Sequence, residues 1–132
     1  MAKIIKVVAG ALCRDGQVLL TSRPIGKNHA GCWEFPGGKI EAHESIFDAI
    51  IRELREELGI IVNVANLNQI SFIEQIYDNV TIQLDVVLVT KWANKPLALE
   101  GQQLFWQSIN DPCLLAPLLP TTQKILDGLK TI

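Results

Sequence analysis

The sequence contains few cysteines, few histidines and no long apolar run, and each shortage excludes a class of protein. Its 132 residues include three cysteines and two histidines. Cys13, Cys32 and Cys113 are odd in number and lack C-x-x-C spacing, which argues against a disulfide framework and a zinc site. The apolar segment 4–13 lacks the cleavage region of a signal peptide, and no segment has the length of a membrane span. We expect reduced thiols in a cytoplasmic protein without a membrane partner.

An excess of positive charge is also missing. Twelve basic and fourteen acidic residues leave a net charge of −2, which argues against a broad basic surface for a nucleic-acid polymer. A free nucleotide is not excluded, because a bound metal ion supplies positive charge locally. The hydrophobic content of 48% and charged content of 20% are typical of a globular chain. The length predicts one domain that covers residues 1–132.

The most informative feature present is a group of carboxylates at helical spacing. Glu53, Glu56 and Glu57 lie at i, i+3 and i+4, so we expect all three on one face of a helix. Anionic side chains this close repel one another unless a cation lies between them. Mg²⁺ prefers such oxygen ligands and keeps positions for water and substrate. A solvated helix face with i, i+4 ion pairs, such as Arg52 with Glu56, is the common alternative.

The residues around this group favour the metal site, because a solvated helix requires no upstream spacing. The pattern G-x5-E-x7-R-E-U-x-E-E-x-G-U, with U a bulky aliphatic residue, is matched at Gly38, Glu44, Arg52, Glu53, Leu54, Glu56, Glu57, Gly59 and Ile60. This is the signature of the Nudix hydrolases, which the chain resembles. The segment 33–39, WEFPGGK, is similar to the one that precedes the signature in MutT-type nucleoside triphosphate pyrophosphohydrolases.

This resemblance implies both a fold and a reaction. The implied fold is α/β, a Nudix α/β/α sandwich with a mixed sheet. The implied reaction is Mg²⁺-dependent hydrolysis of nucleoside triphosphates to a monophosphate and pyrophosphate, with Mn²⁺ as a substitute cofactor. The enzyme would act as a monomer or homodimer and remove damaged nucleotides from the nucleotide pool. The alternatives are hydrolysis of another nucleoside diphosphate derivative, such as ADP-ribose or a dinucleoside polyphosphate, and a non-catalytic Nudix-like binding module.

The resemblance also implies a set of metal ligands. Glu56 and Glu57 would bind metal, and Glu53 is our first choice for a third ligand or for the general base. The Gly38 carbonyl would be a further ligand, since glycine leaves the approach open. Glu100 corresponds to an additional acidic residue on a loop of MutT-type enzymes. A solvated loop glutamate is an equally good interpretation of Glu100.

Supporting and substrate-binding residues follow in the same way. Arg52 is expected to orient a neighbouring glutamate, and Glu44 to stabilise the junction between loop and helix. Arg23 aligns with a substrate-contacting arginine of the family, and Glu34 is a second candidate for substrate binding.

The base-binding residues are the least specified. Phe35 and Tyr77 are candidate walls for a stacked base, and core packing is an equal alternative for each. Where MutT-type enzymes that bind 8-oxoguanine have an asparagine, this chain has Leu118-Leu119. Leu119 makes no hydrogen bond to a base edge, so 8-oxo-dGTP, CTP and modified dCTP all remain candidate substrates. The segment 30–35, AGCWEF, resembles a related group that prefers pyrimidine triphosphates.

Hydrophobic periodicity and turn residues predict the elements that carry these residues. A helix should begin after Ser45 as N-cap and end before Gly59. Asp15-Gly16 and Asp78-Asn79 should form hairpin turns, and Pro36-Gly37-Gly38 should turn the chain. We predict strands at 4–14, 17–23, 32–35, 68–77, 80–92 and 104–109, and a final helix at 121–130.

Overall fold

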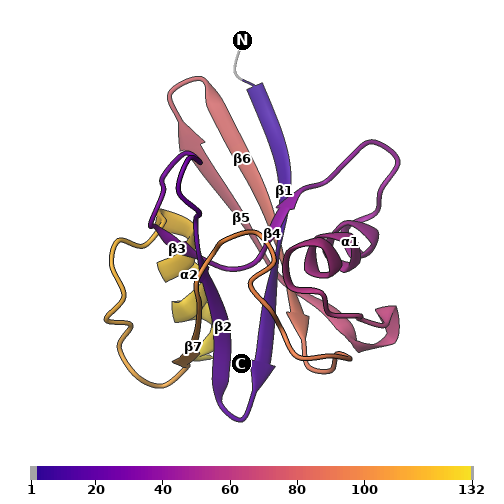
Figure 1. The fold of residues 1–132 in the computed structure, drawn as a ribbon. Coiled ribbons are helices and arrows are strands. Elements are labelled where there is room, and N and C mark those ends of the chain that lie inside the picture. The colour runs from indigo at the N-terminus through magenta and orange to yellow at the C-terminus, as the bar shows by residue number, and fades with distance from the viewer. Residues whose placement is uncertain (1–2, 132) are drawn as a thin grey trace.

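A computed structural model describes residues 3–131 and contains a mixed sheet with one helix on each side (Figure 1). The strands are β1 (Lys3–Arg14), β2 (Gln17–Ser22), β3 (Trp33–Glu34), β4 (Gly37–Lys39), β5 (Leu67–Tyr77), β6 (Val80–Val89) and β7 (Leu104–Ser108). The helices are α1 (Ile46–Leu58), α2 (Pro120–Leu129) and the short 3-10 helix η1 (Val64–Asn66). The α/β/α arrangement expected from the sequence is confirmed.

Strand β1 organises the sheet, because it pairs with three other strands. The strand order is β3-β2-β1-β6-β5, with β4 paired to β1 and β7 paired to β2. β1 runs parallel to β6 from Lys3 opposite Val80 to Leu12 opposite Val89. The predicted hairpin that joins β5 to β6 is confirmed, with Tyr77 opposite Val80. This arrangement brings residues from the beginning and the second half of the chain to one site.

Each face of the sheet has its own hydrophobic core. α1 contributes Ala49, Ile50, Leu54 and Leu58 to one core, and all four are fully buried. α2 contributes Ile125, Leu126 and Leu129 to the other. Because α1 is held by this apolar stripe, its opposite face is left for the carboxylates.

The ends of α1 confirm the two predicted caps. The Ser45 side chain accepts a hydrogen bond from the Asp48 N–H, and Asp48 accepts one from the Ser45 N–H, which is a capping box. Gly59 ends the helix in the left-handed conformation with φ 70°. Among residues 3–131, no helix is long and apolar enough to span a membrane.

One prediction near the site was wrong. Residues Gly37–Lys39 do not form a turn but a short strand, β4, that pairs with residues 7–9 of β1. The Gly37-Gly38 pair is typical of a turn, yet here it permits close approach. A Cβ atom at Gly37 would collide with the Val8 carbonyl oxygen. The predicted strand 80–92 also ends earlier, at Val89.

Candidate metal and nucleotide site

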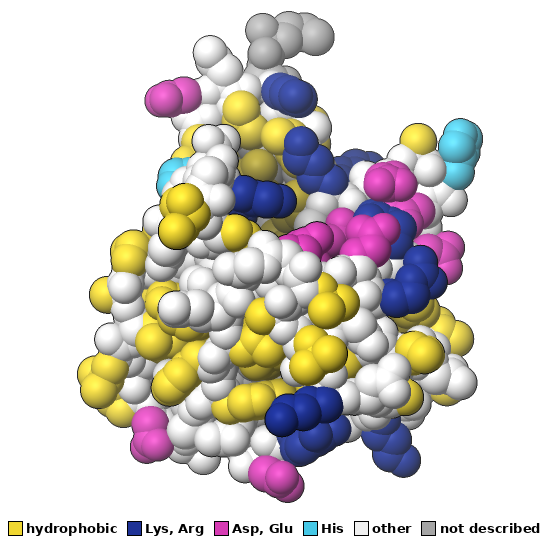
Figure 2. All heavy atoms as spheres, viewed as in Figure 1, with side chains coloured by type: hydrophobic (Ala, Val, Ile, Leu, Met, Phe, Trp, Pro, Cys, Tyr) yellow, Lys and Arg dark blue, Asp and Glu magenta, His cyan; other side chains and the backbone are white. Residues whose placement is uncertain are grey.

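A cavity of about 910 Å³ lies where α1, β4, β6 and the start of α2 meet. Figure 2 shows acidic side chains gathered beside lysines and arginines where the surface is hollowed. The sequence-predicted site residues that line the cavity are Arg23, Glu34, Phe35, Gly38, Arg52, Glu53, Glu56, Glu57, Tyr77, Glu100 and Leu119. Glu44 is not part of the lining and lies behind Arg52. The expected residues are therefore brought together, with Glu44 in a supporting position.

The α1 carboxylates face β4, as helical spacing predicts. Glu57 accepts a hydrogen bond from the Gly37 N–H at 3.0 Å. The Glu53 carboxylate lies so close to Gly38 that a Cβ atom there would be 2.5 Å from Glu53 Oε1. The Glu56 side chain is 51% exposed. Gly38 therefore allows β4 to pack directly against the acidic face of the helix, whereas Gly37 allows β4 to approach β1.

Arg52 connects this acidic face to the loop before α1. Its Nε and Nη2 donate to Glu44 at 2.6 and 2.9 Å, and Nη2 also donates to the Lys39 carbonyl at 3.1 Å. Its Nη1 donates to Glu53 at 2.9 Å and to Glu56 at 3.3 Å. The hydrogen bond to Glu44 raises the pKa of Arg52, and the same bond lowers the pKa of Glu44 to about 2. Arg52 therefore joins Glu44 in the loop to Glu53 and Glu56 on the helix.

Burial and neighbouring negative charges raise the pKa values of Glu53 and Glu57. Burial, followed by the neighbouring Glu53 and Glu100, raises the pKa of Glu57 to about 9. Burial also raises the pKa of Glu53, although Arg52 opposes the shift. Carboxylates that repel one another in a partly buried site fit a divalent cation, which would favour their ionised forms. The donor set therefore suits Mg²⁺ or Mn²⁺.

These ligands are gathered but not preassembled. Within the described residues 3–131, no three His, Cys, Asp or Glu side chains are arranged so that they could hold a metal ion. The carboxylates are instead directed to other partners, because Arg52 holds Glu53 and Glu56 while the Gly37 N–H holds Glu57. Binding of a cation would require these side chains to exchange part of their hydrogen bonding.

A loop between β6 and β7 covers the C-terminal end of α1 and positions Glu100. The Leu99 N–H donates to the Glu57 carbonyl at 3.2 Å, and Gln102 Nε2 donates to the same carbonyl at 3.1 Å. Gln102 Oε1 accepts from the Glu100 N–H at 2.8 Å. Gln102 was not predicted from the sequence, because a buried amide in a polar loop has no sequence pattern that would identify it.

The other end of the cavity is the candidate base site. Arg23 pairs with Glu34 at 3.0 Å, and its Nε donates to the Asn28 carbonyl at 2.7 Å. Burial raises the pKa of Glu34 and the Arg23 charge opposes that shift. The two predicted substrate-binding residues therefore contact each other. Phe35 is buried in the core on the α2 side and also lines the cavity, while Tyr77 is 42% exposed.

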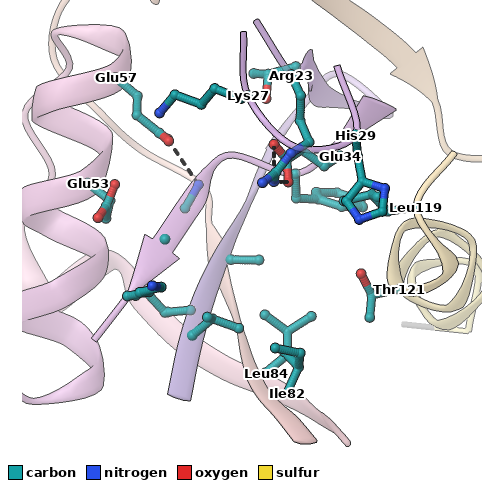
Figure 3. Close-up of a pocket in the computed structure, with 18 of the residues that line it drawn as sticks. Arg23, Lys27, His29, Glu34, Glu53, Glu57, Ile82, Leu84, Leu119 and Thr121 are labelled. Atoms are coloured by element: carbon teal, nitrogen blue, oxygen red, sulfur yellow. Dashed lines mark hydrogen bonds and ion pairs between the residues drawn. The ribbon is translucent and has the colours of Figure 1, made fainter. Parts of the chain in front are cut away.

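Figure 3 shows which side chains enclose this end. Leu119 lies beside α2 near Thr121, while Ile82 and Leu84 point into the cavity from β6. His29 reaches in from the loop before β3. Thr121, Ile82, Leu84 and His29 were not predicted from the sequence, because the periodicity of strands and loops does not indicate which side chains meet across a sheet.

Comparisons with known proteins agree with this geometry. Residues 5–129 match the model of the NUDIX domain. The chain is 43% identical over 84 residues to the 8-oxo-dGTP diphosphatase of Buchnera aphidicola subsp. Acyrthosiphon pisum (strain APS), which is 64% of this chain and 66% of that protein. It is 38% identical over 126 residues to the CTP pyrophosphohydrolase of Escherichia coli (strain K12), which is 96% of this chain and 91% of that protein.

A solved structure extends the similarity to the fold. The solution structure of the E. coli ORF135 protein superposes with a TM-score of 0.83 at 36% identity, and the match covers 98% of this chain and 91% of that chain. The signature on α1, the mixed sheet between two helices and the family match over nearly the whole chain all agree. The chain belongs to the NUDIX family.

Proposed function

We propose that this protein is a Mg²⁺-dependent pyrophosphohydrolase that converts nucleoside triphosphates to monophosphates and pyrophosphate, and so sanitises the nucleotide pool. Its substrates are 8-oxo-dGTP, CTP or a modified dCTP. One observation carries the proposal: a cavity with crowded, partly buried carboxylates at one end has an apolar wall at the other. Relatives named 8-oxo-dGTP diphosphatase and CTP pyrophosphohydrolase support it. The partner is a free nucleotide rather than a nucleic-acid polymer.

In this proposal the metal is held by the Gly38 carbonyl and by the carboxylates of Glu53, Glu56 and Glu57, with Glu100 approaching from its loop. When bound, Mg²⁺ neutralises phosphate charge and lowers the pKa of water. Mn²⁺ is a suitable substitute because it prefers the same oxygen ligands. Glu57 has a fixed position among these ligands, since its carboxylate accepts a hydrogen bond from the Gly37 N–H of β4.

The chain's own residues position the reactants. Arg52 holds Glu53 through Oε1, so the other carboxylate oxygen, Oε2, is the atom that either binds the metal or accepts a proton from the attacking water. Glu44 keeps Arg52 in place by accepting from Nε and Nη2. Arg23, held by Glu34, contacts the nucleotide at the opposite end. Leu119 packs against the base without a hydrogen bond, which favours a broad substrate range.

A panel of nucleoside triphosphates tests the function directly. Pyrophosphate release would be measured with Mg²⁺ on the four ordinary ribonucleotides, on 8-oxo-dGTP and on a modified dCTP. We expect release from several of them, with rates on CTP and 8-oxo-dGTP within about tenfold, because an apolar pocket discriminates weakly. Activity on ADP-ribose or a dinucleoside polyphosphate alone would contradict the proposal. A preference for 8-oxo-dGTP on the order of several hundredfold would contradict the proposed broad substrate range.

Adding one methyl group at Gly38 tests whether β4 positions Glu53. In Gly38→Ala the new Cβ would lie 2.5 Å from Glu53 Oε1, and the flexible carboxylate can move away. We expect kcat to fall by about 10- to 100-fold because the group is misplaced. The free energy of unfolding should change by less than about 1 kcal/mol.

Gly37→Ala is the matched comparison for that variant. Its Cβ would collide with the backbone oxygen of Val8, which cannot move without breaking the β1–β4 pairing. We expect a stability loss of about 2 kcal/mol in urea unfolding. Equal stability losses in the two variants would show that Gly38 serves only the fold.

After removal of metal, the free energy of unfolding should depend on pH because of Glu57. Its pKa of about 9 in the folded chain compares with an ordinary value of 4.5. Below pH 4.5 both states hold the proton; as pH rises toward 9 the unfolded state loses it and the folded state keeps it. The stability of EDTA-treated protein should therefore fall with rising pH, by up to about 1.4 kcal/mol per pH unit.

Urea unfolding between pH 5 and 9 measures this slope. Added Mg²⁺ should restore stability most at high pH, because metal binding to Glu57 displaces a proton. Glu57→Gln, which does not titrate, should lack the slope. A pH-independent stability in the metal-free wild type would contradict the crowded-carboxylate description.

A further inference from the structure

The loop of residues 24–31, between β2 and β3, forms a wall of the cavity that the NUDIX signature does not include. Both of its ends are held by backbone hydrogen bonds, from Arg23 N–H to the Cys32 carbonyl at 2.8 Å and from Gly31 N–H to the Arg23 carbonyl at 2.9 Å. In the middle, the Asn28 carbonyl accepts from Arg23 Nε. The loop therefore has a defined shape over the cavity.

Two side chains of this loop reach opposite ends of the cavity. In Figure 3, His29 points toward Leu119 at the base end, whereas Lys27 extends across the opening toward Glu57. Both line the cavity together with Glu57 and Leu119. Burial raises the pKa of Glu34, and the charges of Arg23 and Lys27 oppose this shift, so the Lys27 charge also acts on its own side of the cavity. The direction of the side chain in Figure 3 places the Lys27 ammonium at the carboxylate end of the cavity.

The charges of the cavity indicate what this ammonium binds. Six acidic residues, Glu34, Glu41, Glu53, Glu56, Glu57 and Glu100, line the cavity with four basic ones, Arg23, Lys27, Lys39 and Arg52. Both arginines are engaged, Arg23 by Glu34 and Arg52 by several glutamates. Neither Lys27 nor Lys39 forms an ion pair within 4.0 Å with any residue in the range 3–131. They are the cations that remain for an anionic ligand.

We propose that Lys27 binds the pyrophosphate portion of the substrate, from the wall opposite the α1 carboxylates. This inference rests on the function proposed above. An ammonium group has three donors and no acceptor, so it suits phosphate oxygens. With the base at the Leu119 end, the terminal phosphates extend toward Glu57, where Lys27 points. Because Lys27 is on a loop and not on the helix, it adds affinity for the phosphate chain without altering the metal ligands.

The test compares ligands that contain different parts of the nucleotide. Isothermal titration in Mg²⁺ would measure the Kd of inorganic pyrophosphate and of CMP for the wild type, Lys27→Met and Lys27→Arg. We expect Lys27→Met to weaken pyrophosphate about tenfold and CMP less than about twofold, with Lys27→Arg within about threefold of wild type. In turnover, KM for the triphosphate should rise about tenfold with kcat within about twofold.

Lys95→Met is the matched control, because Lys95 is exposed on another loop and does not line the cavity. It removes the same charge and should leave both Kd values unchanged. The proposal is overturned if Lys27→Met leaves pyrophosphate affinity unchanged, if Lys95→Met has the same effect, or if CMP weakens as much as pyrophosphate. Absence of pyrophosphate release from every triphosphate would overturn the proposed function alone, since the titrations still decide the role of Lys27.

Discussion

Glu57→Gln is expected to lower the rate of pyrophosphate release by on the order of 10³-fold while the fold stays intact. Burial, followed by the neighbouring Glu53 and Glu100, raises the pKa of Glu57 to about 9. Glutamine keeps the oxygen that accepts from the Gly37 N–H but removes the charge that a cation requires. The loss should be in kcat, measured at saturating Mg²⁺ and substrate.

Stability separates this catalytic effect from misfolding. The metal-free Glu57→Gln protein should be at least as stable as wild type near neutral pH, because it has one crowded acidic group fewer. Glu74→Gln is the control: Glu74 lies on β5, outside the cavity, and accepts a hydrogen bond from Gln83. Its activity should match the wild type. If Glu57→Gln retained more than about a tenth of the activity, the carboxylate would not be a metal ligand.

Arg52→Met is expected to destabilise the protein more than any other variant that we predict, because one guanidinium holds several carboxylates. Arg52 holds Glu44 and Glu53, and the three side chains are only 15–17% exposed. Because these side chains are shielded from solvent, their ion pairs should stabilise the fold more than ordinary surface ion pairs do. Without the guanidinium, the carboxylates would repel one another and the Lys39 carbonyl would lose its donor.

Urea unfolding of metal-free protein at several pH values measures the effect. The pKa of Glu44 is about 2 in the folded chain and ordinarily 4.5, so its ion pair stabilises above pH 4.5 and is lost as the pH falls toward 2. The difference between Arg52→Met and wild type should shrink over that interval. Arg55→Met, on the exposed side of the same helix, should cost less than about 1 kcal/mol. Equal losses from the two arginines would mean that the carboxylate contacts of Arg52 do not stabilise the fold.

The acidic helix could be predicted from sequence because its signals are local. Ser45 and Gly59 are the preferred cap residues, and the apolar stripe of α1 has helical period. The same period places Glu53 and Glu57 on the face opposite the core. Side-chain positions that depend only on neighbours along one helix can therefore be predicted from the sequence.

The remainder of the site depends on contacts between distant segments. β4 was predicted as a turn because Gly37 and Gly38 are locally turn-forming, and only pairing with β1 makes them a strand. The pairing of Arg23 with Glu34 joins the end of β2 to β3, and Lys27 lines the same cavity as the α1 carboxylates only because the 24–31 loop is held over it. Contacts between distant segments leave no periodic pattern in the sequence, so the part of the cavity formed by the 24–31 loop could not be predicted.

The parallel pairing of β1 with β6 also determines when the site can form during synthesis. The first strand to leave the ribosome waits for a partner that ends at Val89, and α1 is made in the interval. At typical elongation rates the nascent acidic helix is complete about 2–6 s before that partner is available. Long-range pairing of this kind slows folding as well. The nascent chain therefore contains its acidic helix before the cavity beside that helix can form.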